Sequence, residues 1–296
     1  MAATTTVVLL SVASGVFWGI GPIFSKAGME RGGDANRATM IVLVVGSSGF
    51  LAASVLRDGS SVVLGDVSPE TLAVFALAGV LGTSFAWLLW FRGIDRIGAS
   101  VSNIVFYTQP LFATVLAALV LGEELTVAIG AGVVFIVGGV VLLSSSSDGD
   151  VDSWSTAALL FPLGAAVFAA VGNVLNRYGF RSSTIAPVEA AAINLTSALP
   201  VLVGYALVYD RRSLVRFRRS DYHFVASGIA NAVGVLTLFA ALSRGPVVVV
   251  SPIVGSSPLF TAVFAYFALG EVERVTARTF VSAALTVTGV VVIAVI

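Results

Sequence analysis

Cysteine is absent from the 296-residue sequence, and charged side chains make up only 11% of it. Without cysteine the chain has no disulfide, no thiolate metal site and no cysteine nucleophile. A soluble domain of this length needs far more polar and charged surface to cover its core. The scarcity of charge therefore excludes an ordinary soluble protein before any motif is considered.

Lysine and histidine each occur once, as Lys26 and His223. A retinal photoreceptor needs a lysine in a late membrane span, and Lys26 lies near the beginning of the chain, so that class is excluded. His223 lies beside Asp221 at the predicted start of a span, where an interfacial role is expected rather than catalysis. The formal net charge of zero gives no indication of a nucleic-acid partner.

Clusters of acidic or histidine side chains, and nucleophiles next to a base, are also missing from the apolar segments. An intramembrane enzyme would need one or the other. No GxxxxGK phosphate-binding loop occurs, so ATP-driven pumping is not expected. The sequence therefore predicts no enzyme, no cofactor and no metal site.

What the sequence has instead is apolar residues in blocks of about 20, the length at which a helix spans a bilayer. Lipid offers no hydrogen-bond partner to an open backbone, so spans are helices or closed barrels, and the alternating pattern of barrel strands is absent. We predict an all-α integral membrane protein with ten transmembrane helices. They lie near residues 5–26, 38–56, 70–91, 98–121, 127–144, 155–176, 187–208, 223–242, 247–269 and 277–295.

Segments of the first half of the chain recur in the second half. VFWGIGPIFSKAG (16–28) aligns with VFAAVGNVLNRYG (167–179), which places Lys26 opposite Arg177. PLFATVLAALVLGE (110–123) aligns with PLFTAVFAYFALGE (258–271), with 8 of 14 positions identical. An ordered series of such matches indicates an internal duplication.

The duplication predicts two repeats, residues 1–144 and 155–296, joined by a polar linker at 145–154. Each repeat holds five predicted spans, an odd number, so the second repeat must enter the membrane inverted relative to the first. Inverted repeats are typical of secondary transporters, which bind their solutes at the repeat interface near the midplane. The sequence thus predicts a central cavity between the two halves.

The Phe17-Trp18-Gly19 stretch with a basic residue at its end, and the paired PLF…LGE segments each followed by a threonine, resemble the EamA-type members of the drug/metabolite transporter superfamily. The resemblance runs through both repeats, except that Ala169-Ala170 replaces Trp18-Gly19 in the second. It implies ten helices, a central cavity and movement of small metabolites, often by export.

We therefore predict a secondary transporter in the cell (plasma) membrane that exports neutral, zwitterionic or amphipathic solutes such as amino acids. The alternative is a polytopic membrane scaffold or receptor that transports nothing. The expected partners are a small-molecule substrate and the lipid bilayer, without nucleic acid. The sequence leaves the oligomeric state open, and a monomer is compatible with it.

Candidate substrate-binding residues are the uncharged polar side chains within the predicted spans. Such groups would lose their hydrogen bonds against lipid, so they are expected to point inward, either into a cavity or toward a neighbouring helix. We expect the cavity between the first, third, fourth, sixth, eighth and ninth spans. The residues predicted to line it are Trp18, Asn103, Tyr107, Asn173 and Asn231.

Carboxylates are nearly absent from the spans. Small multidrug-resistance exporters of the same superfamily depend on a glutamate inside their first helix, and here that helix has none before Glu30. Glu189, shortly after Pro187, is the proton-coupling candidate, with a helix-start charge favoured by the helix dipole as the alternative. Glu123 follows Leu-Gly, where a turn or cap role is predicted, and Thr126 is expected to start the next helix.

The orientation in the membrane has two conflicting indications. Of the 16 basic residues, 12 fall on the side that receives the loops after the odd-numbered spans. Lysine and arginine concentrate in cytoplasmic loops, so this count places both termini outside. The family resemblance implies cytoplasmic termini instead.

Overall fold

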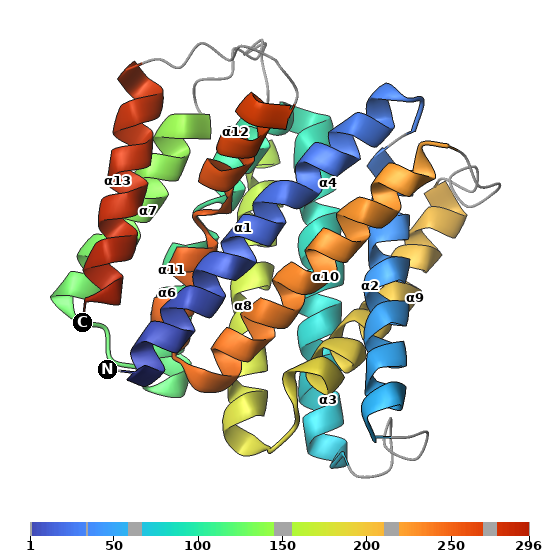
Figure 1. Ribbon diagram of the computed structural model, residues 1–296, viewed down its shortest axis with the longest axis horizontal. Coiled ribbons are helices and arrows are strands. Elements are labelled where there is room, and N and C mark those ends of the chain that lie inside the picture. Colours follow the sequence, from blue (N-terminus) through green and yellow to red (C-terminus); the bar gives the residue numbers. More distant parts are fainter. Residues whose placement is uncertain are drawn as a thin grey trace.

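The computed structural model describes residues 2–33, 35–58, 67–144, 156–209, 219–268 and 277–295, and all regular structure in these ranges is helical (Figure 1). The α-helices are α1 (Ala2–Glu30), α2 (Ala35–Asp58), α3 (Pro69–Ala78), α4 (Ala86–Ile97), α5 (Ala99–Phe106), α6 (Gln109–Leu121), α7 (Val127–Ser144), α8 (Leu160–Ser182), α9 (Pro187–Tyr209), α10 (Asp221–Arg244), α11 (Val247–Val254), α12 (Ser257–Ala268) and α13 (Ala277–Ala294). A π-helical turn, η1 (Gly79–Phe85), joins α3 to α4, and a 3₁₀ turn, η2 (Thr156–Leu159), precedes α8. The predicted all-α class is confirmed.

Eight of the helical runs are long and apolar enough to cross a membrane. They are Thr5–Glu30, Arg37–Arg57, Pro69–Ile97, Val101–Leu121, Ala157–Ser182, Pro187–Tyr205, Asp221–Arg244 and Val247–Ala265. Two shorter apolar helices, Val127–Leu143 and Phe280–Ala294, coincide with the fifth and tenth predicted spans. The multi-pass architecture is therefore observed, and the count of ten spans stays a prediction.

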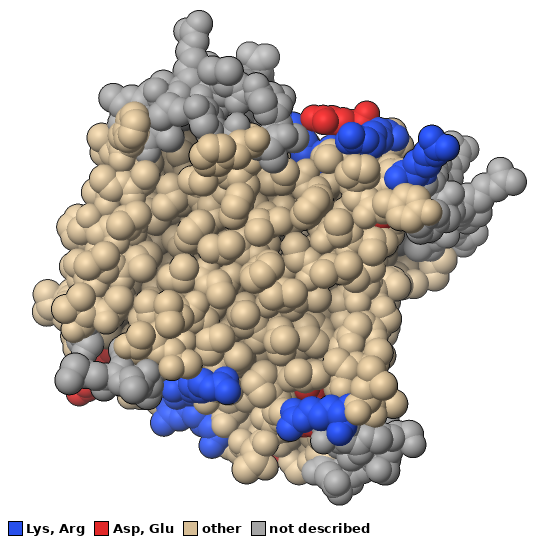
Figure 2. Space-filling view, in the orientation of Figure 1, with Lys and Arg blue, Asp and Glu red and all other residues tan. Residues whose placement is uncertain are grey.

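Charged side chains are distributed over the surface as expected of a membrane protein. Figure 2 shows charged side chains along two opposite rims of the molecule and a broad uncharged band between them. Many large apolar side chains are exposed, among them Leu119 (77%) and Phe280 (68%). Lipid solvates such side chains as well as a protein core does, so their exposure is expected.

The most extensive helix contacts join the two halves of the chain. Helix α1 packs against α10, α11 and α12, and α8 packs against α3, α4, α5 and α6. Helix α2 packs against α9 and α10, and α7 packs against α13. In Figure 1, α1 begins at the end of the molecule where both termini lie, whereas α8 ends there.

A pair of glycines lets α8 approach η1 closely. A Cβ atom at Gly82 would lie 2.6 Å from the Cα of Gly172, so neither position has room for a side chain. Small residues at helix crossings are typical of membrane proteins, where close packing replaces the hydrophobic effect as the driving force between helices. This contact sets the distance between two walls of the cavity described below.

Two of the spans are interrupted near their centres. The fourth breaks at Tyr107–Thr108 between α5 and α6, and the ninth breaks at Gly255–Ser256 between α11 and α12. Pro110 and Pro258 follow these breaks in the first turn of α6 and of α12, where the missing N–H of proline is tolerated. Discontinuous helices near mid-depth are a feature of transporter binding sites, because they free backbone groups toward a cavity.

Candidate functional site

A cavity of about 320 Å3 lies at the centre of the molecule, next to both helix breaks. Helices of both halves contribute to it, including α1, α4, α8 and α10. Among the described residues that line it, none is charged. Its size falls at the lower end of the roughly 300–1,000 Å3 typical of pockets for small molecules.

Aromatic side chains form one wall of the cavity, contributed by α1, α4 and the break between α5 and α6. The rings of Trp90 and Phe106 have their centroids 6.0 Å apart, and those of Phe106 and Tyr107 lie 6.3 Å apart. Trp18 and Trp87 complete this wall. The two ring pairs are tilted by 42° and 59°, and the wall offers an apolar surface to a bound solute.

A second wall carries side-chain amides that meet at Ser251 of α11. Gln109 Nε2 lies 3.2 Å and Asn173 Nδ2 lies 3.4 Å from Ser251 Oγ, and both amides donate to this hydroxyl. The three residues come from α6, α8 and α11, so the contact ties both halves together at the cavity. One hydroxyl cannot satisfy every donor and acceptor of two amides, which leaves hydrogen-bonding capacity toward the cavity.

A second cluster of polar side chains lies where α9 meets η1. The Asn194 amide donates to Asn176 Oδ1 at 3.2 Å, and Thr83 Oγ1 donates to Asn194 Oδ1 at the same distance. All three side chains line the cavity. Asn194 is 3% exposed, so this network is buried and holds α9 in register with α8 and η1.

Trp18 has a hydrogen-bond donor with no partner. Its indole Nε1 is buried and makes no hydrogen bond among the described residues, while its ring packs against Gly234 of α10. A buried N–H without an acceptor costs about 1–3 kcal/mol. Trp18 lines the cavity, but Nε1 itself lies against Gly234, so a bound solute would satisfy it only after the indole ring turns toward the cavity.

Of the five residues predicted to line the cavity, four do so: Trp18, Tyr107, Asn173 and Asn231. Asn103 is not part of the wall. Its Oδ1 accepts a hydrogen bond of 2.9 Å from Trp90 Nε1, so it orients a ring that is in the wall. The predicted set of helices was also incomplete, since α2 and α9 contribute residues in addition to the spans that were named.

Glu189 lies outside this cavity. It lines a separate apolar pocket between α2, α3 and α9, and its Oε2 accepts a hydrogen bond of 3.1 Å from the backbone N–H of Ala186. That contact satisfies an open N–H group at the start of the helix that carries Glu189. The geometry agrees with the helix-start alternative, and proton coupling through Glu189 stays a prediction.

Sequence reasoning missed Thr83, Trp87, Trp90, Gln109 and Asn194 as wall residues. The signal for Asn194 was available, because it is a lone amide in an apolar block, AAAINLTS.

Sequence reasoning also missed an ion pair between Arg37 and Asp221. The pair is bidentate: Arg37 Nε donates to Asp221 Oδ1 at 2.6 Å, and Arg37 Nη2 donates to Asp221 Oδ2. Both side chains are almost fully buried at the starts of α2 and α10, away from the cavity.

The sequence matches the model of the EamA-like transporter family twice, over residues 5–145 and 156–295. It is 26% identical over 264 residues to a protein of Arabidopsis thaliana named WAT1-related protein, chloroplastic. That alignment covers 86% of this chain and 62% of the relative, so the chain spans about three fifths of the relative's length.

A shorter relative and a solved structure add to this comparison. A segment of 75 residues is 33% identical to the permease-like protein YdzE of Bacillus subtilis, covering 25% of this chain and 96% of that one. A protein of known crystal structure superposes with a TM-score of 0.81 over 97% of this chain and 94% of its own, at 18% identity. At that identity the superposition shows a shared fold alone.

Proposed function

The chain belongs to the EamA-like transporter family, and we propose that it carries a small solute across the membrane through the central cavity, without ATP. Members of this family are transporters rather than enzymes, which confirms the expectation that the chain is not an enzyme. The scaffold or receptor alternative has no support from the family. The observation that carries the proposal is the uncharged central cavity, whose mainly apolar lining includes aromatic rings and side-chain amides.

The chemistry of the walls favours a neutral, zwitterionic or amphipathic solute such as an amino acid. A net charge moved from water into a cavity without an opposite charge loses several kcal/mol of solvation. A zwitterion is better matched, because the amides of Gln109 and Asn173 and the indole N–H of Trp18 suit a carboxylate. The aromatic wall suits an apolar side chain or an ammonium group through cation–π attraction.

The proposed substrate-binding residues are Trp18, Tyr107, Asn173 and Asn231, with Asn103 acting on Trp90. Tyr107 and Gly255 lie at the two helix breaks and both line the cavity. Since the breaks occur in the segments that the sequence repeat relates, the site lies where the two halves meet.

We further propose ten spans in two inverted repeats, at 1–144 and 155–296; the linker at 145–154 lies outside the described residues. Phe75 packs on Gly179 and Phe224 packs on Gly28, and the repeat alignment relates Gly28 to Gly179. The packing of α1 on α10 and α12 likewise has its counterpart in α8 on α3 and α6. The opposite directions of α1 and α8 support the inversion (Figure 1).

The proposed location is the cell membrane, with export as the proposed direction. The Arabidopsis relative is named chloroplastic, so a fluorescent fusion that localises to an internal organelle would contradict this part. Accessibility of a terminal tag in intact cells decides between termini outside, which the basic residues favour, and termini inside, which the family resemblance favours.

Flux into liposomes tests the function. Purified protein is reconstituted, and counterflow of labelled neutral amino acids is compared with that of a sugar phosphate. Asn173→Leu removes an amide from the wall, and loss of such a hydrogen bond at about 1–3 kcal/mol lowers substrate affinity roughly 5- to 150-fold. Ser48→Leu is the control, because Ser48 is exposed on α2 and bonds only to its own helix.

A sugar phosphate carried faster than every neutral solute would refute the substrate class. Equal losses in Asn173→Leu and Ser48→Leu would refute the site, because only the first residue faces the cavity.

Proton coupling has Glu189 as its candidate. Glu189→Gln keeps the shape of the side chain and removes its charge. If Glu189 carries the coupled proton, the dependence of flux on a pH gradient is lost in this variant. An unchanged pH dependence with lowered thermal stability assigns Glu189 to the helix start alone.

A further inference from the structure

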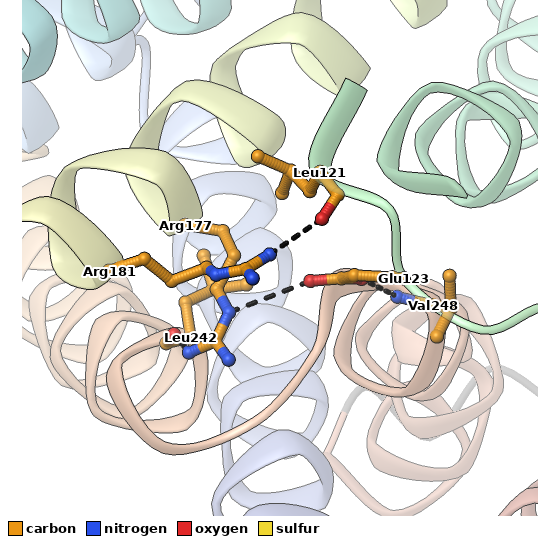
Figure 3. Close-up of polar contacts among 6 residues, drawn as sticks. All are labelled: Leu121, Glu123, Arg177, Arg181, Leu242 and Val248. Atoms are coloured by element: carbon orange, nitrogen blue, oxygen red, sulfur yellow. Dashed lines mark hydrogen bonds and ion pairs between the residues drawn. The ribbon is translucent and has the colours of Figure 1, made fainter. Parts of the chain in front are cut away.

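Glu123 lies in the turn after α6, at the end of the molecule that carries both termini, and it contacts α8 and α11 (Figure 3). It follows α6 directly after Gly122, whose positive φ of 63° turns the chain sharply. Its Oε2 accepts a hydrogen bond of 3.1 Å from the backbone N–H of Val248, in the first turn of α11. Its Oε1 lies 3.5 Å from Nε of Arg177 on α8.

Arginine side chains extend this contact to the ends of two more helices. Arg177 Nη1 donates to the carbonyl of Leu242 near the end of α10, at 2.7 Å. Arg181 Nη1 donates to the carbonyl of Leu121 at the end of α6, also at 2.7 Å. The ends of α6, α8 and α10 and the start of α11 are thereby joined, and we call Glu123 and Arg177 the latch.

The latch is shielded from solvent. The Glu123 side chain is 5% exposed and that of Arg177 is 17% exposed. Glu123 Oε1 and Arg177 Nε are buried and make no hydrogen bond among the described residues, so each relies on the charge of the other. Removing either partner leaves an uncompensated charge, which favours any arrangement that lets water in.

The latch lies one helical turn from the cavity on three helices. Asn173 lies in the cavity wall and Arg177 follows four residues later on α8, while Leu238 of the wall precedes Leu242 by the same spacing on α10. Ser251 lies three residues after Val248 on α11. Each step is about 4.5–6 Å along a helix, toward the end that carries the termini.

Three aromatic rings fill the remaining space at the same level. Phe75 of α3, Phe180 of α8 and Phe239 of α10 meet with ring centroids 5.0 to 6.4 Å apart. Phe239 also lines the cavity, so the cluster forms its floor. None of the three rings is more than 9% exposed, so the cluster is closely packed and shielded from solvent.

We propose that Glu123 and Arg177 are positioning residues of the transport cycle, which hold the floor of the cavity closed on the side of the termini and separate when that side opens. This inference rests on the proposed transport function. It gives a role in closing the cavity to an ion pair that joins several helix ends and does not contact the solute.

The absence of cysteine makes a direct test available. Ala169→Cys places a single thiol in the cavity wall, and a membrane-impermeant thiol reagent is applied from one side of vesicles whose orientation a terminal tag reports. Adding Glu123→Gln is expected to raise the labelling rate from the side of the termini about tenfold, within the roughly 5- to 150-fold range of two-state couplings. Labelling from the opposite side is expected to fall.

Glu70→Gln is the matched control. Glu70 is a carboxylate at the same end of the molecule and bonds to Tyr178, the neighbour of Arg177, but it is not part of the latch. Its substitution is expected to leave labelling from both sides unchanged. The paired variant Glu123→Gln with Arg177→Gln contains no lone buried charge, so it folds even where a single variant does not.

Increased labelling in the paired variant, without an increase in Glu70→Gln, supports the proposal. Unchanged labelling in a folded paired variant overturns it and leaves the ion pair a structural contact. The labelling rate reports whether the floor is closed, and its measurement does not require transport of a solute. A changed labelling pattern together with failed amino acid flux would therefore refute the substrate class and keep the latch.

Discussion

Replacing Phe75 by alanine should destabilise the protein. The size of the loss depends on whether the ring enters water or lipid when the helices separate. Phe75 is fully buried, and its ring contacts those of Phe180 and Phe239 at centroid distances of 5.0 and 6.4 Å. In a soluble core, Phe→Ala costs about 3–5 kcal/mol. About 1.5–3 kcal/mol of such a loss is transfer of the ring out of water.

Lipid removes most of the transfer contribution, because the ring stays in an apolar medium when the helices separate. What remains is lost packing and the cavity beneath the solute site, so we expect about 2 kcal/mol from the difference of these values. Reversible unfolding in mixed detergent micelles measures it. Phe280→Ala is the control, because this side chain is 68% exposed to lipid, and a change within about 0.5 kcal/mol is expected.

Two outcomes would refute this reasoning. A loss near 5 kcal/mol would show that water, rather than lipid, is the correct reference for the cavity floor. Equal changes in Phe75→Ala and Phe280→Ala would show that the three-ring cluster is loosely packed and does not close the floor.

Three further substitutions and one control substitution have defined outcomes. Gly172→Leu should abolish folding or flux, because a Cβ there would lie 2.6 Å from the Cα of Gly82, whereas Gly204→Ala, with open space around it, should have the stability and flux of the parent protein. Trp18→Phe removes an N–H that has no partner among the described residues, so stability should rise or stay equal while substrate affinity falls roughly 5- to 150-fold, as binding assays would show. Asn103→Leu removes the acceptor of Trp90 Nε1 and should weaken binding less than Asn173→Leu does, because Asn103 is outside the cavity wall.

Hydrogen-bonding chemistry made much of the site predictable. Asn173 and Asn231 had to face inward, because an amide that faces lipid has no partner. Asn103 also found a hydrogen-bond partner, but on a neighbouring helix instead of in the cavity wall. The fourth span breaks at Tyr107–Thr108, and Asn103, which precedes the break, accepts from Trp90 of α4.

Glu123 shows which contacts a local sequence pattern predicts and which it does not. The turn after Leu121 and the predicted cap role are both observed, and Thr126 accepts from the N–H of Ile129 at the start of α7 as expected. The helix that Glu123 caps, however, is α11, which begins 124 residues later in the chain. No local pattern reports such a partner.

The sequence by itself determined the membrane environment, the helical class and the duplication. These follow from the length of the apolar blocks and from the need of every backbone group in lipid for a hydrogen bond within its own segment. Only the tertiary structure decided which polar side chains meet at Ser251, which rings close the floor and which helix end receives Glu123. Those contacts join helices that are distant in sequence, and in lipid they depend on shape and on single hydrogen bonds, which composition does not encode.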